Sequence, residues 1–224
     1  MTQLEDVTVT VQGNLDKLQA ERNASWPADR LAAHEAFRLS LEDAADRAGF
    51  VTVGGVVEPF TLPEVDGGIV SLDELLRTGP VVLIFFRFEG WPACDVALPA
   101  YRDALFPETE RLGAHLVAIS PRIPEKLRAI KERHGFEFLV ASDPDATLLH
   151  AFGIAFGPDE VEQDTRRRSG SDLGEVFGTG RWELPYPTVV VVDSNHVVRF
   201  ADVHPNWMIR TAATAVVEAL RSIS

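Results

Sequence analysis

The sequence predicts an α/β fold: a central mixed sheet flanked by helices, with an N-terminal helical extension. Residues 81–86 are apolar throughout, which is typical of a central parallel strand buried on both faces. Strand-like and helix-like segments alternate after it, and that order builds a parallel sheet. Two adjoining strand-like segments and a helix end the chain, which predicts an antiparallel edge. We therefore expect residues 1–50 to form a helical extension packed on a main domain of residues 51–224.

The first fifty residues are predicted to be helical. Pro27 stands near a helix start, where its missing N–H costs nothing, and Gly49 ends the helical run. Apolar side chains recur on one helical face at Phe37, Leu41, Ala44, Ala45 and Ala48.

Residues 56–79 carry turn and capping signals. Two short extended pieces are expected over residues 56–72, on either side of a turn at Asp66-Gly67. Ser71 and Glu74 form a capping box for a short helix that stops at Gly79.

The remaining elements follow in order along the chain. A helix is expected from about residue 93 to residue 112, with a kink at Pro99. Residues 155–182, rich in glycine and charge, are expected to form a long loop with local helix. The other predictions are a strand over 114–120, a helix over 124–135, a strand over 136–142, a short helix capped by Asp143 with Pro144 first and Gly153 last, a strand over 187–193 paired with 196–202, and a final helix with Ile209, Ala213, Val216 and Leu220 on one side.

The composition excludes several classes of function. The net charge of −13 disfavours nucleic acid as a partner, because an acidic surface repels phosphates. The sequence has neither a run of about 18 apolar residues nor a signal-like N-terminus, so we expect no membrane partner and a cytoplasmic location. The six histidines show no metal-ligand spacing and no phosphate-loop motif is present, so no metal or cofactor is expected.

Cys94 is the only cysteine, which rules out an internal disulfide and favours a reducing compartment. A lone cysteine is more often an inert core residue. Cys94, however, follows the apolar strand and a loop containing glycine and proline, so its sulfur is predicted to lie at a helix N-terminus, where the dipole favours an anion. The thiolate is the reactive form, and a free thiol with a pKa of about 8.5 is mostly protonated at neutral pH. Arg87 is the nearest cation in sequence, whereas Glu89 and Asp95 would oppose ionisation if they point inward.

Several pieces of the sequence together resemble one family. As a set they are similar to the peroxiredoxin-like branch of the alkyl hydroperoxide reductase and thiol-specific antioxidant family, over residues 10–222. The resemblance implies a thioredoxin-like fold and an antioxidant oxidoreductase. The pieces are "FTLPEVDGG", "VSLDELL", "GPVVLIFFR", "LGAHLVAISPRIPEKL", "ASDPDATLLHAFGI" and "WELPYPTVVVVD".

The resemblance also implies roles for residues around the cysteine. Cys94 falls on the peroxide-attacking position of the family motif P-x-x-x-T-x-x-C. The nearer relatives have R-G-x-W-C-P-x-C, which "RFEGWPAC" matches at Arg87, Gly90, Pro92 and Cys94. Trp91 stands where the family has threonine or a first cysteine. Arg87 is then expected to support the thiolate, and Trp91 and Pro92 to frame the substrate pocket.

A second departure precedes the predicted strand 187–193. The family has an arginine there, and this sequence has Pro187. Tyr186-Pro187 resembles the cis-proline of thioredoxins, so Pro187 is expected to face the thiol and complete the pocket. Arg181 or another arginine is expected to take the place of the missing one.

The implied reaction is a one-cysteine peroxidase cycle, because the chain has no second cysteine. Cys94 would reduce a hydroperoxide, and an external thiol reductant (thioredoxin, a glutathione-like or a mycothiol-like thiol) would restore it. A homodimer is expected. Two alternatives stay open: a catalytically inactive thioredoxin-fold binding module, which Trp91 and the flanking acids favour, and a transferase-like relative that binds glutathione non-covalently.

Overall fold

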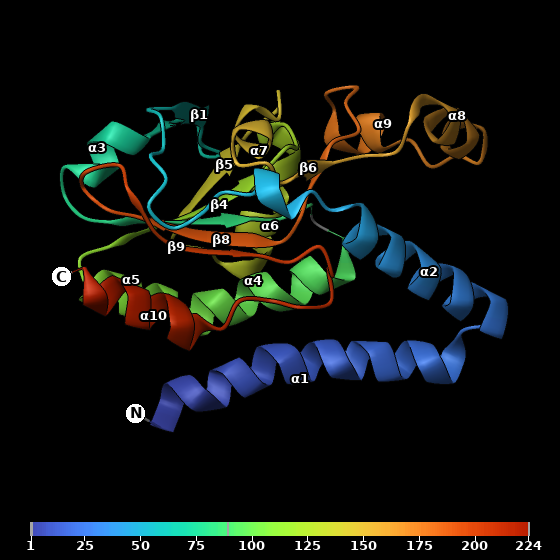
Figure 1. Cartoon of the computed structure of the whole chain (residues 1–224), viewed down its shortest axis with the longest axis horizontal. Helices are drawn as coiled ribbons and strands as arrows, with labels where there is room; N and C mark the ends of the chain where they lie inside the picture. The colour runs from blue at the N-terminus through green and yellow to red at the C-terminus, as the bar shows by residue number, and fades with distance from the viewer. Residues whose placement is uncertain (1, 89, 224) are drawn as a thin grey trace.

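The core is a five-stranded mixed sheet in the order β5-β4-β3-β8-β9 (Figure 1). The computed structural model describes residues 2–88 and 90–223, with side chains from residue 11 onward. β3, β4 and β5 are parallel, whereas β8 is antiparallel to both of its neighbours, as predicted. The strands are β3 (Val81–Phe85), β4 (His115–Ser120), β5 (Leu139–Ser142), β8 (Thr188–Val192) and β9 (Val198–Val203).

β3 is the central strand, and all five of its residues are buried. Leu83 pairs with Val117 of β4 on one side and with Val190 of β8 on the other. Val82 and Ile84 point into one hydrophobic cluster, and Leu83 points into a second cluster on the opposite face. The strand is apolar throughout because both faces are covered.

Helices cover both faces of the sheet (Figure 1). The helices that pack on the cluster containing Val82 are α4 (Pro92–Ala104), α5 (Phe106–Arg111), α6 (Pro124–His134) and α10 (Ala213–Ser222). Those on the cluster containing Leu83 are α3 (Leu72–Leu76) and α7 (Thr147–Ala151).

Smaller elements connect these layers. They are the antiparallel pairs β1 (Thr61–Pro63) with β2 (Ile69–Ser71) and β6 (Ala155–Phe156) with β7 (Leu184–Pro185), the helices α8 (Glu160–Arg168) and α9 (Leu173–Phe177), and a 3₁₀ turn, Arg47–Gly49.

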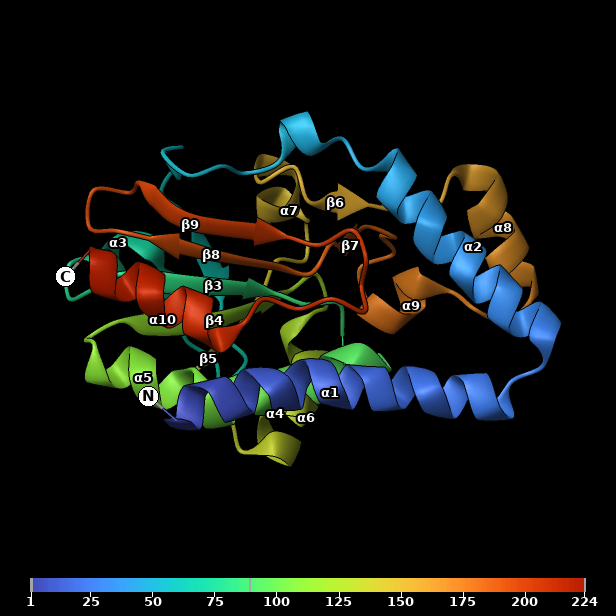
Figure 2. The ribbon, with the colours of Figure 1, turned by 60° about the horizontal axis from the view of Figure 1, so that its bottom comes forward.

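The N-terminal region is helical, as predicted, and forms α1 (Thr2–Ser25) and α2 (Ala28–Ala44). α1 lies across α4 and α10 on their side away from the sheet (Figure 2). Val11, Leu15 and Leu41 are buried in the same cluster as the residues of α4 and α10. We call α1 and α2 the N-terminal helix pair (residues 2–44).

The helix after the cysteine differs from its prediction. α4 continues through Pro99 and stops at Ala104, and α5 begins at Phe106. The single helix expected from about residue 93 to residue 112 is therefore two helices, separated at Leu105. Pro107, which lacks an N–H for the ladder, lies directly after this break.

Two other boundaries also differ. Asp143 does cap a helix, accepting from the N–H groups of Thr147 (2.9 Å) and Leu148 (2.9 Å), but that helix begins at Thr147 rather than at Pro144. Ile209 lies before α10 and is exposed, so it does not belong to that helix's apolar face. Residues 155–182 contain α8 and α9, which are the local helix expected within this segment. Within the described ranges, no helix is both long and apolar enough to span a bilayer.

Candidate active site

Cys94 is the third residue of α4, just after the loop that leaves β3. Its N–H donates to the carbonyl oxygen of Trp91 (2.8 Å), which closes the first helical turn. The side chain is 2% exposed. The sulfur therefore lies at the positive end of the α4 dipole, as the sequence predicted, and largely out of water.

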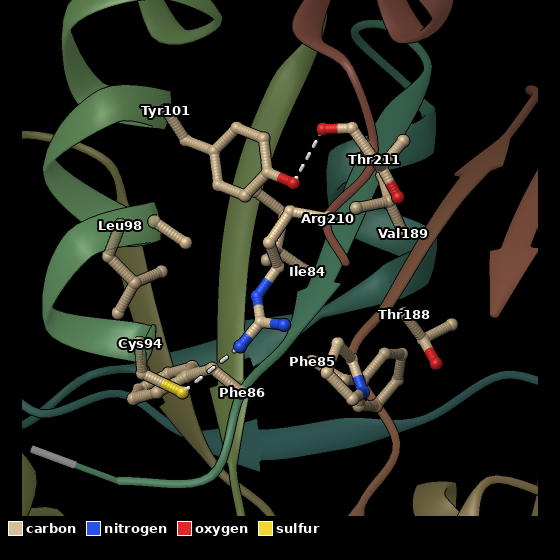
Figure 3. A pocket seen from close by; sticks show the side chains of 12 residues that line it. Ile84, Phe85, Phe86, Cys94, Leu98, Tyr101, Thr188, Val189, Arg210 and Thr211 are labelled. Atoms are coloured by element: carbon tan, nitrogen blue, oxygen red, sulfur yellow. Dashed lines mark hydrogen bonds between the residues drawn. The ribbon is translucent and has the colours of Figure 1, made fainter. Parts of the chain in front are cut away.

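The sulfur borders a very small cavity (Figure 3). The cavity has a volume of about 10 Å³, which is the room that one water molecule occupies. Its walls come from β3, α4, the start of β8 and the chain between β9 and α10. We call residues 204–212 the β9–α10 connection.

Arg210, on the β9–α10 connection, reaches the cysteine. Its Nη2 lies 3.9 Å from Cys94 Sγ (Figure 3). Its Nη1 donates to the carbonyl oxygens of Trp207 and of Ile209 (2.9 Å). The guanidinium is thus held against its own backbone with one nitrogen on the sulfur, where it stabilises a thiolate.

Arg87 is the second cation of the site. It is 1% exposed, and its guanidinium carbon lies 4.5 Å from the ring centroid of Trp91 and 5.0 Å from that of Phe156. Across the described part of the chain, its Nε, Nη1 and Nη2 have no hydrogen-bond partner. Burial lowers the pKa of Arg87 to about 9, while the charge of Cys94 acts to raise it. At neutral pH the site therefore contains a buried cation close to the cysteine.

Two hydrogen bonds fix the backbone at Phe86 and Arg87, where the chain leaves β3. The Ser120 hydroxyl, at the end of β4, donates to the carbonyl oxygen of Arg87 (2.6 Å). The N–H of Phe86 donates to the carbonyl oxygen of Ile119 (3.0 Å), which extends the strand pairing by one residue. These bonds direct the chain past the end of the sheet toward Cys94.

Trp91 and Pro92 lie beside the cavity rather than in it. Trp91 stacks on Arg87 and meets Trp207 edge to face, with ring centroids 5.5 Å apart, and it does not line the cavity. Pro92 is the exposed first residue of α4. The large ring at position 91 therefore encloses the guanidinium and neither walls nor plugs the space beside the sulfur.

Pro187 does line the cavity, as Cys94 does. The expectation of a cis peptide at Tyr186-Pro187 was wrong, since no cis bond occurs in the described ranges. The trans bond carries the chain straight into β8: Tyr186 N–H donates to the carbonyl oxygen of Ile154 (2.9 Å), and the Pro187 carbonyl oxygen accepts from His204 N–H (2.9 Å).

Arg181, named from the sequence as a substitute for the family arginine, lies elsewhere. It is exposed and pairs with Asp145 and Glu183. Another arginine, Arg210, takes the place beside the sulfur.

Hydrogen bonds hold the β9–α10 connection in place near both of its ends. The Tyr101 hydroxyl, on α4, donates to the carbonyl oxygen of Thr211 (2.8 Å; Figure 3). Burial raises the pKa of Tyr101, so the phenol keeps the proton that it donates. Asp202 interacts with His204 (2.9 Å) and with the Thr211 side chain, and the bond from His204 lowers the pKa of Asp202.

Asp95 and Glu89 are the two acids that flank Cys94 in the sequence. The Asp95 carboxylate accepts from the N–H of Gly90 (3.2 Å), which ties it to the loop before α4. Glu89 lies outside the described residues. Among residues 2–88 and 90–223, no group of three or more His, Cys, Asp or Glu side chains is arranged to hold a metal ion.

Three residues of the site were not singled out from the sequence as functional: Arg210, Trp207 and Tyr101. Arg210 is 116 positions from Cys94, in a segment without a motif. Trp207 packs on both Arg87 and Trp91. The only local signal was an arginine set among apolar residues in "NWMIRTAA".

The sequence is similar to known proteins of one family. A model of the AhpC/TSA family matches residues 53–201. A Mycobacterium tuberculosis (strain CDC 1551 / Oshkosh) protein named as a peroxiredoxin is 36% identical over 111 residues, which are 50% of this chain and 69% of that protein. The chloroplastic peroxiredoxin Q of Sedum lineare is 30% identical over 149 residues, 66% of this chain and 67% of that protein.

A solved structure supports the fold. The crystal structure of peroxidoxin BcpB from Mycobacterium tuberculosis superposes with a TM-score of 0.61 over 78% of this chain and 99% of that one, at 24% identity. The family match over residues 53–201 spans more than half of the chain and contains Cys94 and Arg87. The chain therefore belongs to the AhpC/TSA family, as a peroxiredoxin-like thiol peroxidase with a thioredoxin-like fold.

Proposed function

We propose that Cys94 is the peroxide-reducing nucleophile and that it works in a one-cysteine cycle. The observation that carries this proposal is the Arg210 Nη2 atom 3.9 Å from Cys94 Sγ, at a cavity with room for one water molecule. A neutral core cysteine needs no such partner. A thiolate does, because an unpaired anion in a site of low dielectric is costly.

The proposed reaction has two halves. The Cys94 thiolate attacks the outer oxygen of a hydroperoxide, the O–O bond breaks, and the leaving alkoxide or hydroxide takes up a proton. Arg210 stabilises the thiolate and the charge that moves onto the leaving oxygen. Arg87, which lies among aromatic rings, keeps the electrostatic potential at the site positive. Pro187 shapes the cavity wall, whereas Trp91 and Pro92 support the loop and the start of α4.

The second half needs an external reductant. Cys94 is the only cysteine, so the sulfenic acid meets no thiol of its own chain. An external thiol attacks the sulfenic sulfur, water leaves, and a second thiol releases Cys94 as a disulfide forms. We propose thioredoxin or a glutathione-like or mycothiol-like thiol as that reductant.

A cytoplasmic location and a homodimer are also proposed. A reducing compartment suits a peroxidase that must regenerate one free thiol. Sedimentation of the purified chain, before and after peroxide treatment, measures whether a dimer forms.

The test of the nucleophile is single-turnover peroxide reduction. The reduced protein is mixed with hydrogen peroxide, and both peroxide loss and the mass of Cys94 are followed. We expect one equivalent consumed and a gain of one oxygen, with both effects absent in Cys94→Ser. Equal, slow peroxide loss in the two proteins would favour the inactive binding module.

The role of Arg210 is tested against a matched arginine. Arg210→Met should slow Cys94 oxidation by roughly tenfold to a hundredfold, since a hydrogen bond to a charged group contributes about 1.5–3 kcal/mol. Arg181→Met removes an exposed, ion-paired arginine and should keep the wild-type rate. If the two variants behave alike, Arg210 is not the residue that activates the sulfur.

A further inference from the structure

The N-terminal helix pair and the β9–α10 connection, which lie near opposite ends of the sequence, contact each other beside the active site. The family match covers residues 53–201, so both the N-terminal helix pair and the β9–α10 connection lie outside it. Figure 2 shows the connection running beside α1 on its way to α10. Gln12 Nε2 donates to the carbonyl oxygen of Met208 (3.5 Å), and Arg22 Nη1 lies 3.7 Å from Met208 Sδ.

Trp207 is the residue through which these parts touch the site. It is 1% exposed. On one side the Arg22 guanidinium carbon lies 5.4 Å from a Trp207 ring centroid, and the His34 ring meets it edge to face at 4.6 Å. The same side chain meets Trp91 at 5.5 Å and Arg87 at 5.8 Å. Trp207 is therefore packed between the N-terminal helix pair on one side and Arg87 with Trp91 on the other.

The backbone of Trp207 also sets the position of Arg210. Its carbonyl oxygen accepts from Arg210 Nη1, while Arg210 Nη2 lies on the cysteine sulfur. A displacement of Trp207 therefore moves the acceptor that holds the guanidinium. The side chain of Trp207 contacts one cation and its carbonyl binds another.

The burial of the charged Arg22 side chain is energetically unfavourable, which implies that the charge has a role. Its side chain belongs to a residue only 7% exposed, and burial together with the nearby Arg30 lowers its pKa. The rings of Trp26 (5.1 Å) and Trp207 (5.4 Å) are its compensating partners. An apolar residue would close α1 onto the core without this desolvated charge.

We propose that the N-terminal helix pair is a positioning element of the active site: Arg22 and His34 hold Trp207, and Trp207 holds Arg210 on the sulfur of Cys94. This inference rests on the proposed function of Cys94. It assigns to the helix pair an effect on chemistry at a sulfur that it does not touch.

A double-mutant cycle tests the chain of contacts. Arg22→Met should slow Cys94 oxidation by hydrogen peroxide about fivefold to tenfold, and should change the rate less than about twofold when Arg210→Met is already present. Non-additivity of this kind is expected only if Arg22 acts through Arg210. Arg22→Lys, which keeps a cation at the rings, should recover most of the rate.

The matched control is Arg30→Met. Arg30 belongs to the same helix pair and stacks on Trp26 at 3.8 Å. This variant should keep the wild-type rate. His34→Leu, which removes the edge contact to Trp207, is the second probe and should behave like Arg22→Met, so an unfolded Arg22 variant does not end the test. Thermal unfolding of each variant identifies any loss of fold.

Two results would overturn the proposal. One is wild-type rates in folded Arg22→Met and His34→Leu. The other is an equal slowing by Arg22→Met with and without Arg210→Met. The same cycle is repeated with the rate of Cys94 alkylation by iodoacetamide. If wild-type protein reduces no peroxide, the proposed function fails, whereas coupling in the alkylation rates still decides the positioning role.

Discussion

At the scale of single residues, two arginines near one sulfur play different parts. Arg210 makes a directed contact with Cys94, whereas Arg87 is enclosed by aromatic rings and acts through its charge. Both would act from a site that is largely out of water, since Cys94 is 2% exposed and Arg87 1%. Electrostatic interactions are stronger there than at the surface, where water screens them.

The cavity predicts a preference among peroxides. A cavity of about 10 Å³ has room for one water molecule, so its walls must open less for hydrogen peroxide than for a peroxide with a bulky substituent. We expect hydrogen peroxide to oxidise Cys94 at least about tenfold faster than cumene hydroperoxide, the scale on which pockets reject added carbon. Leu98→Ala, which enlarges the cavity, should reduce the ratio of the hydrogen peroxide rate to the cumene hydroperoxide rate. Stopped-flow rates measure it, and equal wild-type rates for both peroxides would contradict the prediction.

At the scale of elements, the end of the N-terminal region is fastened to α7 by close backbone contact. Val51 N–H donates to the carbonyl oxygen of Phe152 (2.9 Å). Gly153 follows with φ +68°, and a Cβ at this position would lie 1.9 Å from the carbonyl oxygen of Gly49. Glycine is required here both by its left-handed backbone and by the space.

Gly153→Ala should therefore destabilise the protein more than the same substitution does at a left-handed glycine with open space around it. Gly170, with φ +79° and open space around its missing Cβ, is the matched position. Gly170→Ala should cost about 1 kcal/mol for the backbone alone, and Gly153→Ala roughly 3 kcal/mol, because the backbone must also shift. Urea unfolding gives both values; equal losses would mean that the contact with Gly49 relaxes freely.

At the scale of the whole molecule, the N-terminal helix pair is part of the core. Leu15 is completely buried in the same cluster as the residues of α4 and α10. His34 joins this packing through Trp26 and Trp207. Burial lowers the pKa of His34, and the nearby Arg22 adds to the shift.

The stability of the whole chain should therefore fall in mild acid. The folded state holds His34 neutral to a lower pH than the unfolded state does, so the unfolded chain binds more protons below pH 6.5, and stability is lost as pH falls from there. Thermal unfolding midpoints at pH 5.5 and 7.0 should differ less in His34→Gln than in wild type. Part of the difference should remain, because burial also lowers the pKa of His115. An unchanged difference in the variant would exclude His34 as a cause.

Much of the fold follows from local patterns. The apolar run of β3, the Ser71 cap and the placement of Cys94 just after the start of a helix all depend on residues close together in the chain. The break at Leu105 was missed because Pro99 and Pro107 both lie in that segment, and the helix start at Thr147 was missed because Pro144 was predicted to be the first helical residue.

The amino-acid sequence by itself determined the α/β class, the strand that carries the site and the cysteine that the helix presents, since periodicity, caps and turns act over a few residues. Only the tertiary structure decided which arginine meets the sulfur, that Pro187 is trans, and that Trp91 encloses Arg87. These depend on side chains such as Cys94 and Arg210, 116 positions apart, which packing of α1, α4 and the β9–α10 connection brings together.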